Sequence, residues 1–435
     1  MRHTAAFRSV ALATLLLFTV SCVSTQLPPI SSQGDGFKPL RGEQALWDRS
    51  REEEETLLEN VKLYKDPLLD SYLEGVVARL NPPGMAANPA IRYKVRVIED
   101  PTLNAFAYPH GSIYIHTGLL ARMESEDELA TALAHEMTHV ENRHMLRYER
   151  SALNKQIGFS IVAIAAAVVL ADAEEDALSH GDWAKGTAID VFGQLAVSLG
   201  LQLAFMASVN GYGRGLEWEA DEGGFRKMAA AGYDLGKAPE LYEALLEDRG
   251  DTRRAEGFFF GSHPRLKERI ASTYVYLGKH PAGPVDEAAR AERDEAFSQR
   301  IRPVVRDDAR LNLEMGRLAL AEGQLERMRS WMTGDPEMHF LMGRLRLAQA
   351  EDATDDERGR LRDEAEDSFR RSIELDADRP APHRELGLLL YERRDLGGAC
   401  VQFRRYTSLA PDEDDTGRFE DYVREMERDG SCQLR

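Results

Sequence analysis

The stretch SEDELATALAHEMTHV, residues 125–140, constrains the fold more than any other part of the chain. It opens with Ser125 and places Glu128 three positions later, which is the pattern of a capping box at the start of a helix. The helix carries an HExxH string in its interior, from His135 to His139. Because four residues make just over one helical turn, the two imidazoles lie on one face and can bind one Zn²⁺ at ~2.0–2.1 Å.

Glu136 points to a neighbouring angle of the same helix. That position suits a general base that takes a proton from the attacking water, rather than a third ligand. Chance alone gives roughly three HExxH strings per hundred chains of this length, so the assignment depends on a third ligand. A histidine six residues after His139 would complete one type of site, but Met145 stands there.

The remaining candidate for the third ligand is a glutamate on a later helix. The sequence EWEAD, residues 217–221, offers Glu217 and Glu219. Asp221 lies one turn beyond Glu217, where it can accept the outer N–H of a ligating histidine and orient the ring. The spacing therefore predicts a metal centre that two separate helices build together.

A small sheet is predicted upstream of the HExxH helix. Apolar residues alternate with basic ones over residues 91–98, as in a half-buried strand. Two shorter strands are predicted at 105–108 and 112–116, and 112–116 is expected to be an edge strand to which an extended substrate can add. From the HExxH helix to Leu277 the chain has the pattern of helices and loops. The fold class is therefore α+β and mainly helical.

Other segments also have helical character. Residues 44–80 are predicted to be helical and to end at an Asn-Pro-Pro-Gly stop. The apolar run 157–171 is shorter than the ~20 residues that span a bilayer, and a second run covers 191–209. We interpret both runs as buried or interfacial helices in preference to membrane spans.

The C-terminal part, about residues 305–411, has the spacing of tetratricopeptide repeats. In the clearest unit the small, apolar and turn residues fall at the expected places: Leu386, Gly387, Leu390, Ala399, Phe403 and Pro411. The preceding unit offers Gly343, Ala365 and Phe369. This predicts an all-α array of helical hairpins, whose concave surface holds peptides or proteins. A generic helical bundle is the alternative.

The N-terminus is typical of a secretory signal. Two arginines precede an apolar run, Val10–Val20, that is too short to span a bilayer. The run ends in Thr-Val-Ser-Cys, which resembles a bacterial lipobox and makes Cys22 the predicted acylation site. An ordinary cleaved signal is the alternative. Residues 22–43, rich in Ser, Gly, Gln and Pro, are expected to form a flexible tether.

Composition excludes several other classes of protein. The chain has 435 residues, 43% hydrophobic and 30% charged, which are the values of a globular protein with more than one domain. Its 74 acidic and 55 basic residues give a net charge of −19, which argues against a nucleic-acid partner. Three cysteines exclude a disulfide-rich scaffold. With Cys22 acylated, Cys400 and Cys432 can pair in an oxidising compartment.

Taken together, the motifs resemble those of the HtpX/BepA group of zinc metallopeptidases, metallopeptidase family forty-eight. HExxH and ExxAD are accompanied by Asn104-Ala105-Phe106-Ala107 upstream and Ser262-His263-Pro264 downstream. The resemblance covers about residues 55–275. The sequence departs from the family pattern at His110, where a glycine is usual.

The resemblance implies a zincin-type domain and a role for each matching residue. It makes the first glutamate of ExxAD a ligand, so that one Zn²⁺ per chain is held by His135, His139 and Glu217, with Glu136 as the catalytic base. It assigns Asp221 to the support of a ligand and Arg214 to orientation or charge support. His263 matches the family's Ser/Thr-His-Pro histidine, and three roles stay open for it: filling the open metal position in a latent enzyme, capping the helix that starts near Pro264, or donating to the oxyanion.

The resemblance, the signal and the repeats together predict a zinc endopeptidase of the periplasm, anchored to the outer membrane through lipidated Cys22. Its expected partners are unfolded or misassembled envelope proteins and, through the repeats, the outer-membrane protein assembly machinery. One alternative is a chaperone or assembly factor in which proteolysis is secondary. Another is a scaffold lipoprotein with a vestigial site.

The predicted domain order follows from these segments. It is a signal (1–21), a tether (22–43), a metallopeptidase domain (44–278), a linker (279–304) and a repeat domain (305–435).

Overall fold

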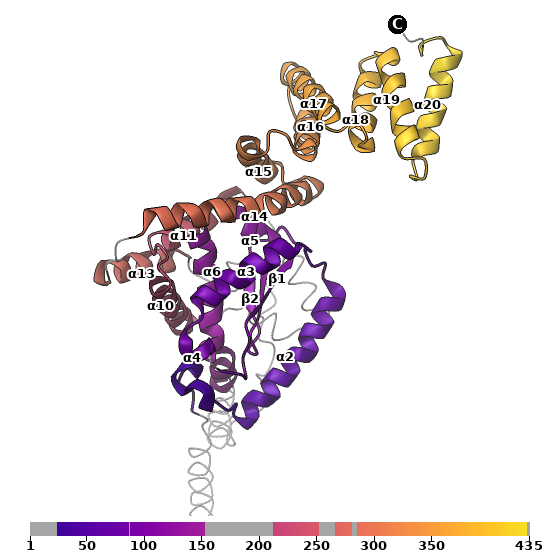
Figure 1. The fold of residues 1–435 in the computed structure, drawn as a ribbon. Coiled ribbons are helices and arrows are strands. Elements are labelled where there is room, and N and C mark those ends of the chain that lie inside the picture. Colours follow the sequence, from indigo (N-terminus) through magenta and orange to yellow (C-terminus); the bar gives the residue numbers. More distant parts are fainter. Residues whose placement is uncertain (1–23, 87, 153–211, 252–265, 281–284, 433–435) are drawn as a thin grey trace, which may run out of the picture. The chain divides into compact units, whose positions relative to one another are not determined.

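The structure is a computed structural model that describes residues 24–86, 88–152, 212–251, 266–280 and 285–432 (Figure 1). These residues fall into two compact units, the first ending at Phe297 and the second made of 120–122 and the chain from Ser298. Several predictions lie outside the described residues: the signal and Cys22, the apolar runs 157–171 and 191–209, and His263. Among the described residues, no helix combines the length and the apolar character needed to cross a membrane.

A three-stranded sheet lies inside the first unit. Its strands are β1 (Lys94–Ile98), β2 (Ala105–Ala107) and β3 (Ser112–His116), in the order β1-β3-β2. β3 pairs with β1 in parallel and with β2 in antiparallel orientation. The prediction of 112–116 as an edge strand is therefore wrong. All five residues of β3 are buried, which is the burial expected of a central strand.

Helices pack against this sheet. α2 (Arg41–Asn60) places Leu46 and Leu57 in one core cluster with Phe106 and Tyr114 of the sheet. α3 (Pro67–Leu80) contacts β1, and α6 (Glu126–Glu141) contacts β2 and β3. The sheet therefore fixes α6, the helix that carries HExxH.

The prediction of one helical segment over 44–80 is wrong between α2 and α3. The chain is extended there, and Leu63 forms an isolated antiparallel bridge with Ile98 of β1. Asp66 then caps α3, with Pro67 at the first turn of the helix. An Asp-Pro pair at this point is a helix-start signal that outweighs the continuous apolar pattern.

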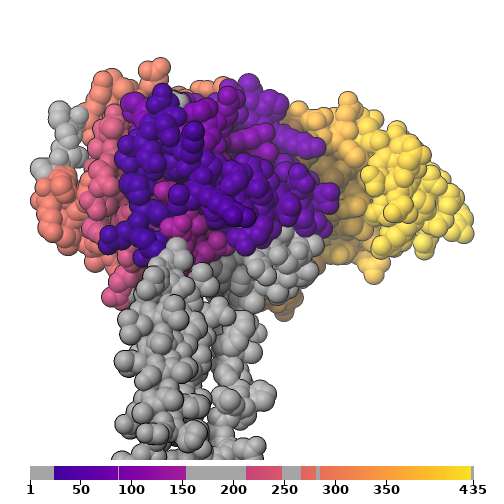
Figure 2. All heavy atoms as spheres, turned by 90° about the horizontal axis from the view of Figure 1, so that it is seen from below, coloured from indigo at the N-terminus to yellow at the C-terminus, as the bar shows by residue number. Residues whose placement is uncertain are grey.

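Residues 30–43 are packed, so the predicted tether extends too far. η1 (Ile30–Gly36) buries Ile30, and the buried Phe37 lies beside Trp47 of α2. The Ser31 hydroxyl donates to the carboxylate of Glu141. The indigo N-terminal segment accordingly lies against magenta surface in Figure 2. Burial of these two apolar side chains is favourable and, with the Ser31 contact, holds this polar segment on the domain.

Four further helices belong to the first unit: α4 (Pro83–Ala86), α10 (Arg214–Ala230), α11 (Lys237–Asp251) and α13 (Leu266–Lys279). Two more begin in it and end in the second unit: α5 (Thr117–Arg122) and α14 (Glu287–Glu314). α10 packs closely along α6, and α13 packs against α11. The predicted linker, 279–304, is helical from Glu287. Arg290 pairs with Glu287 one turn away, so its charges suit a solvated helix.

The second unit continues with helices only: α15 (Leu318–Trp331), α16 (Pro336–Glu351), α17 (Asp355–Leu375), α18 (Pro380–Glu392), α19 (Leu396–Leu409) and α20 (Thr416–Arg428). α16 packs on α17 and α18 packs on α19. A disulfide joins Cys400 and Cys432, whose Cα atoms lie 5.6 Å apart, an ordinary spacing for such a bond. The α+β, mainly helical fold class is thus confirmed.

Candidate metal centre and active site

α6 begins as the sequence predicts. Ser125 lies before the helix in an extended conformation, and its hydroxyl accepts the N–H of Glu128 at 3.3 Å. The Glu128 carboxylate accepts the N–H of Glu124 at 2.9 Å, one residue earlier than a capping box requires. The helix is buried along its whole length and ends at Glu141, before Arg143 at φ 60°. The HExxH string is therefore held rigidly inside the domain.

α10 brings the second part of the site against α6. Gly223 faces the side chain of Thr138, and Gly224 faces the backbone at His135, where an added Cβ would lie 3.3 Å from the amide nitrogen. Side chains at these positions would separate the two helices. The glycine pair therefore permits the close approach that places Glu217 of α10 beside the two histidines of α6.

His135, His139 and Glu217 converge on one point. Their ligand atoms all lie within 4.8 Å of one another, and all three residues are buried. The two Nε2 atoms are 2.9 Å apart, and Glu217 carboxylate oxygens lie 3.5 Å from Nε2 of His135 and 3.9 Å from Nε2 of His139. Donors around a tetrahedral ion with bonds of ~2.0–2.1 Å are about 3.4 Å apart, which these distances bracket. The three residues thus fit a metal ion of zinc size.

The outer nitrogen of His135 is held by a buried ion pair. His135 Nδ1 donates to Asp221 Oδ1 at 2.8 Å, which directs Nε2 toward the other ligands. Arg269 of α13 contacts both oxygens of Asp221, at 3.0 and 2.5 Å. Burial alone would raise the pKa of Asp221, but Arg269 and His135 lower it to about 2. Asp221 is therefore an anion that fixes the ring of the ligand.

The outer nitrogen of His139 has a different partner. His139 Nδ1 lies 2.9 Å from Nδ1 of the fully buried His144. Burial lowers the pKa of His144, which favours a neutral ring that accepts this hydrogen bond. Glu219 lies 3.7 Å beyond His144 and also pairs with Arg147, and these two partners lower the pKa of Glu219 to about 2. Glu219 therefore supports the site from outside and faces away from the ligand cluster.

Tyr212 closes the site next to His139. Its ring stacks on the imidazole of His139, with centroids 4.4 Å apart, and its N–H donates to Glu217 at 3.1 Å. Burial, together with the charges of Glu136 and Glu217, raises the pKa of Tyr212 well above its ordinary value. The phenol therefore stays protonated and can act only as a neutral hydrogen-bonding group.

The structure brings together most of the predicted site residues, but not Arg214. That arginine is exposed and pairs with Glu268, whereas the arginine that reaches the site is Arg269. Sequence reasoning missed Arg269. A usable signal existed, because Arg269 falls in the buried stripe of α13 between Leu266 and Thr273, where an unpaired arginine would be costly.

Two histidines and a glutamate on packed helices, with a further glutamate inside HExxH, define a metallopeptidase-type centre. Comparison with known proteins identifies it. Residues 67–274 match the model of peptidase family M48, so the chain carries a peptidase M48 domain, and the predicted family is confirmed.

Several curated proteins are similar to this chain. The beta-barrel assembly-enhancing protease of Escherichia coli (strain K12) is 27% identical over 213 residues, 48% of this chain and 39% of that protein. The mitochondrial metalloendopeptidase OMA1 of Schizosaccharomyces pombe is 31% identical over 43% of this chain and 47% of its own length. Protease HtpX of a Shewanella species is 33% identical over 41% of this chain and 66% of its own. The chain thus spans less than half the length of the first two.

Proposed function

We propose that the chain is a zinc-dependent endopeptidase of the bacterial cell envelope. The single observation that carries the proposal is the buried convergence of His135, His139 and Glu217, with Asp221 holding one ligand ring. Among the described residues, no other group of three His, Cys, Asp or Glu side chains is arranged to hold a metal ion.

In this proposal His135, His139 and Glu217 hold one Zn²⁺, which supplies Lewis-acid activation of the peptide carbonyl and of water. The residues of the chain do the rest. Asp221 and His144 keep the two imidazoles in the tautomer that presents Nε2 inward. Burial of the centre excludes bulk water and strengthens each of these interactions.

Glu136 moves the proton. It follows His135 on α6, is buried, and lies close enough to Tyr212 for its charge to act on the phenol. As a general base it takes a proton from the attacking water, and as a general acid it delivers this proton to the leaving amine. Tyr212, whose neutral phenol ring stacks on His139, is the donor we propose for the oxygen that gains negative charge.

The scissile segment adds to β2 in this proposal, which replaces the predicted role of 112–116. His116 N–H donates to Asn104 O at 2.9 Å, and Tyr108 N–H donates to Ser112 O at 2.8 Å. Pairing alternates along an antiparallel ladder, so the backbone groups of Ala105 and Ala107 face away from β3. β2 packs against α6 and its three residues are buried, so only an extended, unfolded peptide strand could pair there.

We further propose a cellular location and a set of protein partners. The lipobox-like segment supports acylation at Cys22 and retention at the outer membrane, facing the periplasm. The similarity to a beta-barrel assembly-enhancing protease supports misfolded or misassembled outer-membrane proteins as substrates. Repeat spacing supports tetratricopeptide-like hairpins at α16–α19 that dock substrate or the assembly machinery.

The test uses Glu136→Gln in the full chain. This variant should retain zinc and lose cleavage of unfolded envelope proteins, which can then be trapped on it and identified. His144→Phe, a change in the support of His139, should lower zinc affinity without abolishing cleavage at saturating zinc. Full cleavage by Glu136→Gln would exclude the proposed mechanism.

A second function is favoured by the helix pairs of the second unit, because Glu136 and the three proposed metal ligands all lie in the first unit. The chain would then be a chaperone or assembly factor in which proteolysis is secondary. Complete rescue of an envelope assembly defect by Glu136→Gln would select this function over the endopeptidase.

A further inference from the structure

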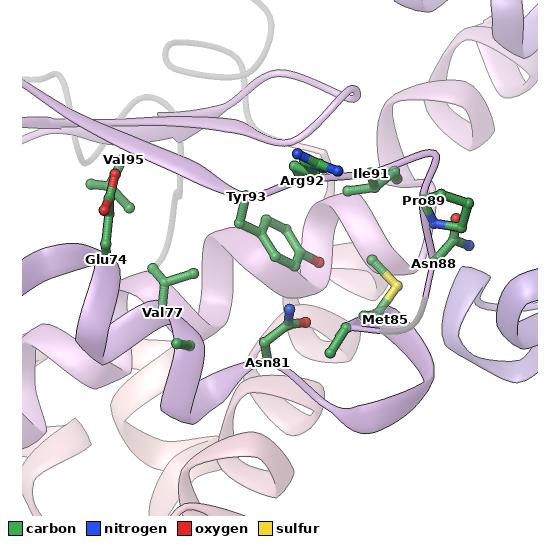
Figure 3. Close-up of a pocket in the computed structure, with 12 residues that line it drawn as sticks. Glu74, Val77, Asn81, Met85, Asn88, Pro89, Ile91, Arg92, Tyr93 and Val95 are labelled. Carbon is green, nitrogen blue, oxygen red and sulfur yellow. The ribbon is translucent and has the colours of Figure 1, made fainter. Parts of the chain in front are cut away.

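A groove lies between α3 and the outer edge of β1 (Figure 3). Its lining residues do not include the proposed metal ligands or Glu136. Its volume is ≈ 540 Å³, within the usual range of ligand sites. Val77, Met85, Ile91 and Val95 form a buried apolar floor, while the exposed Glu74 lines its rim. The apolar floor can bind an apolar side chain, while the polar rim can contact the polypeptide backbone that carries it.

The edge of β1 in this groove has hydrogen-bonding capacity to spare. Lys94 N–H donates to Gly111 O at 3.2 Å, and in a parallel ladder alternate residues bond to the same neighbour. Val95 therefore directs its N–H and C=O outward. Val97, two residues on, confirms the direction, because its C=O accepts the N–H of Tyr64. Within the described part of the chain, no hydrogen bond to the main chain of Val95 is found.

A helix beside an open strand edge is the architecture that receives an added strand. The backbone of the incoming chain bonds to the strand, and its alternate side chains enter the groove. Asn81, directly after α3, has an unmet hydrogen-bonding group: within the described residues its side-chain oxygen is buried and accepts no hydrogen bond. An N–H donor on the incoming chain would satisfy it, as the amides of a polypeptide can.

The geometry points to a docking site for an extended polypeptide segment that places an apolar side chain on Val77, Met85 and Ile91 and pairs its backbone with Val95. This inference rests on the proposed function for the nature of the ligand, an unfolded protein substrate. The groove acts as a second binding site for that substrate, at the opposite edge of the sheet from β2.

Tyr93 joins the groove to the catalytic helix. Tyr93 lies in the centre of the groove wall (Figure 3). It donates its hydroxyl to the carbonyl of Met137 at 3.1 Å, and Met137 stands between the two histidine ligands in the sequence. A segment bound at β1 therefore packs against a residue that contacts α6 directly. A substrate held there stays at high local concentration for the active site.

The width of the sheet determines how long a substrate must be to bind at the β1 edge and the β2 edge at the same time. Strands added at the two edges are four inter-strand spacings apart, about 19 Å, which an extended chain of at least ~6 residues must bridge. A peptide of six residues in total can therefore occupy only one site. A long unfolded protein can occupy both, so the groove should affect long substrates alone.

The binding test uses the full chain with Glu136→Gln and a permanently unfolded probe, reduced and carboxymethylated α-lactalbumin. Ala78→Trp fills the groove from its exposed rim, and Ala229→Trp is the matched change on the exposed face of α10. The dissociation constant should rise at least fivefold with Ala78→Trp and stay unchanged with Ala229→Trp. Equal affinities would overturn the site.

A second measurement leaves the groove unaltered. Hydrogen–deuterium exchange of the segment containing Val95 should slow when the probe binds, because strand addition gives its outward N–H a hydrogen-bond partner. Unchanged exchange at saturating probe would overturn the inference. Both measurements avoid catalysis, so they stand if the chain cleaves nothing, and cleavage of a hexapeptide tests the proposed activity separately.

Discussion

The helix pair α6 and α10 and the helix pair α16 and α17 are joined in a similar way. In the first pair Gly223 meets the side chain of Thr138, and in the second Gly343 meets the ring of Phe369. Each glycine allows two helices to approach more closely than any larger residue would. The two pairs nevertheless enclose different chemistry.

The α6–α10 pair buries His135, Glu217 and Asp221, whereas the α16–α17 pair buries Leu345 and Phe369. Charged residues of the second unit are mostly at its surface, as in the pair of Arg371 and Glu374, whose side chains are 49% and 63% exposed. Burying polar and charged groups costs free energy unless each has a partner. The α6–α10 pair therefore buries the polar groups of a metal site, whereas the α16–α17 pair buries apolar side chains that stabilise the fold.

The largest expected effect is loss of a ligand from the α6–α10 pair. Glu217→Gln should lose stoichiometric zinc and reduce hydrolysis of a short peptide by roughly 10³-fold or more, since three protein ligands leave no spare. Zinc content by mass spectrometry and peptide hydrolysis measure the two effects. Glu219→Gln is the control and should retain zinc. The assignment is wrong if Glu219→Gln strips the metal while Glu217→Gln keeps it.

A smaller effect is expected from the residue that holds a ligand in place. Arg269→Gln leaves Asp221 without its buried cation and should weaken zinc binding by about 10- to 100-fold. A zinc-chelator competition measures this without reference to activity. Arg214→Gln is the matched control, because Arg214 is exposed and pairs only with Glu268 among its described contacts. Equal losses in both variants would contradict the assignment of Arg269.

Glu217 and Arg269 also differ in whether the sequence alone could identify them as site residues. HExxH was found because helical spacing and ligand chemistry are local properties of the chain, and Glu217 and Asp221 were found because the ExxAD motif resembles that of a known family. The strands at 105–107 and 112–116 were predicted within a residue for the same reason. Arg269 was missed because its partner is 48 residues away, and no local pattern connects them.

The errors in the fold have the same origin. Strand order depends on pairing between segments, so the central place of β3 is invisible in its own five residues. Ile30 and Phe37 stand in a polar stretch whose composition is typical of a tether, and only the surface of the domain shows where they are buried. The sequence therefore predicted the residues of the site well, but it did not predict the long-range contacts that hold them in place.

A third prediction concerns stability, which should depend on pH through a buried carboxyl of α6 and not through an exposed carboxyl of α17. Burial raises the pKa of Glu128 in α6 to about 7 from an ordinary 4.5. A carboxyl with a raised pKa contributes its full stability below about 4.5 and loses it as the pH rises through 7. Glu128→Gln should therefore raise the free energy of unfolding by about 2 kcal/mol at pH 8 and hardly change it at pH 4.

Chemical denaturation at the two pH values measures this difference. Glu374→Gln in α17 is the control, because its exposed carboxylate should give no such dependence on pH. A gain for Glu128→Gln that is equal at pH 4 and pH 8 would show that the carboxyl is not held protonated by the fold.

The smallest effect tests the shared glycine contact itself. Gly343→Ala puts a Cβ 2.5 Å from the Phe369 ring, so the helices must shift, and the alanine's better helix propensity offsets part of the cost. The second unit should lose about 1 kcal/mol, whereas Gly359→Ala, with open space around it, should gain about 0.5 kcal/mol. Zinc content should be unchanged in both, while Gly223→Ala should lower it by moving Glu217 from the histidines. Zinc loss in Gly343→Ala would show that the two pairs are coupled.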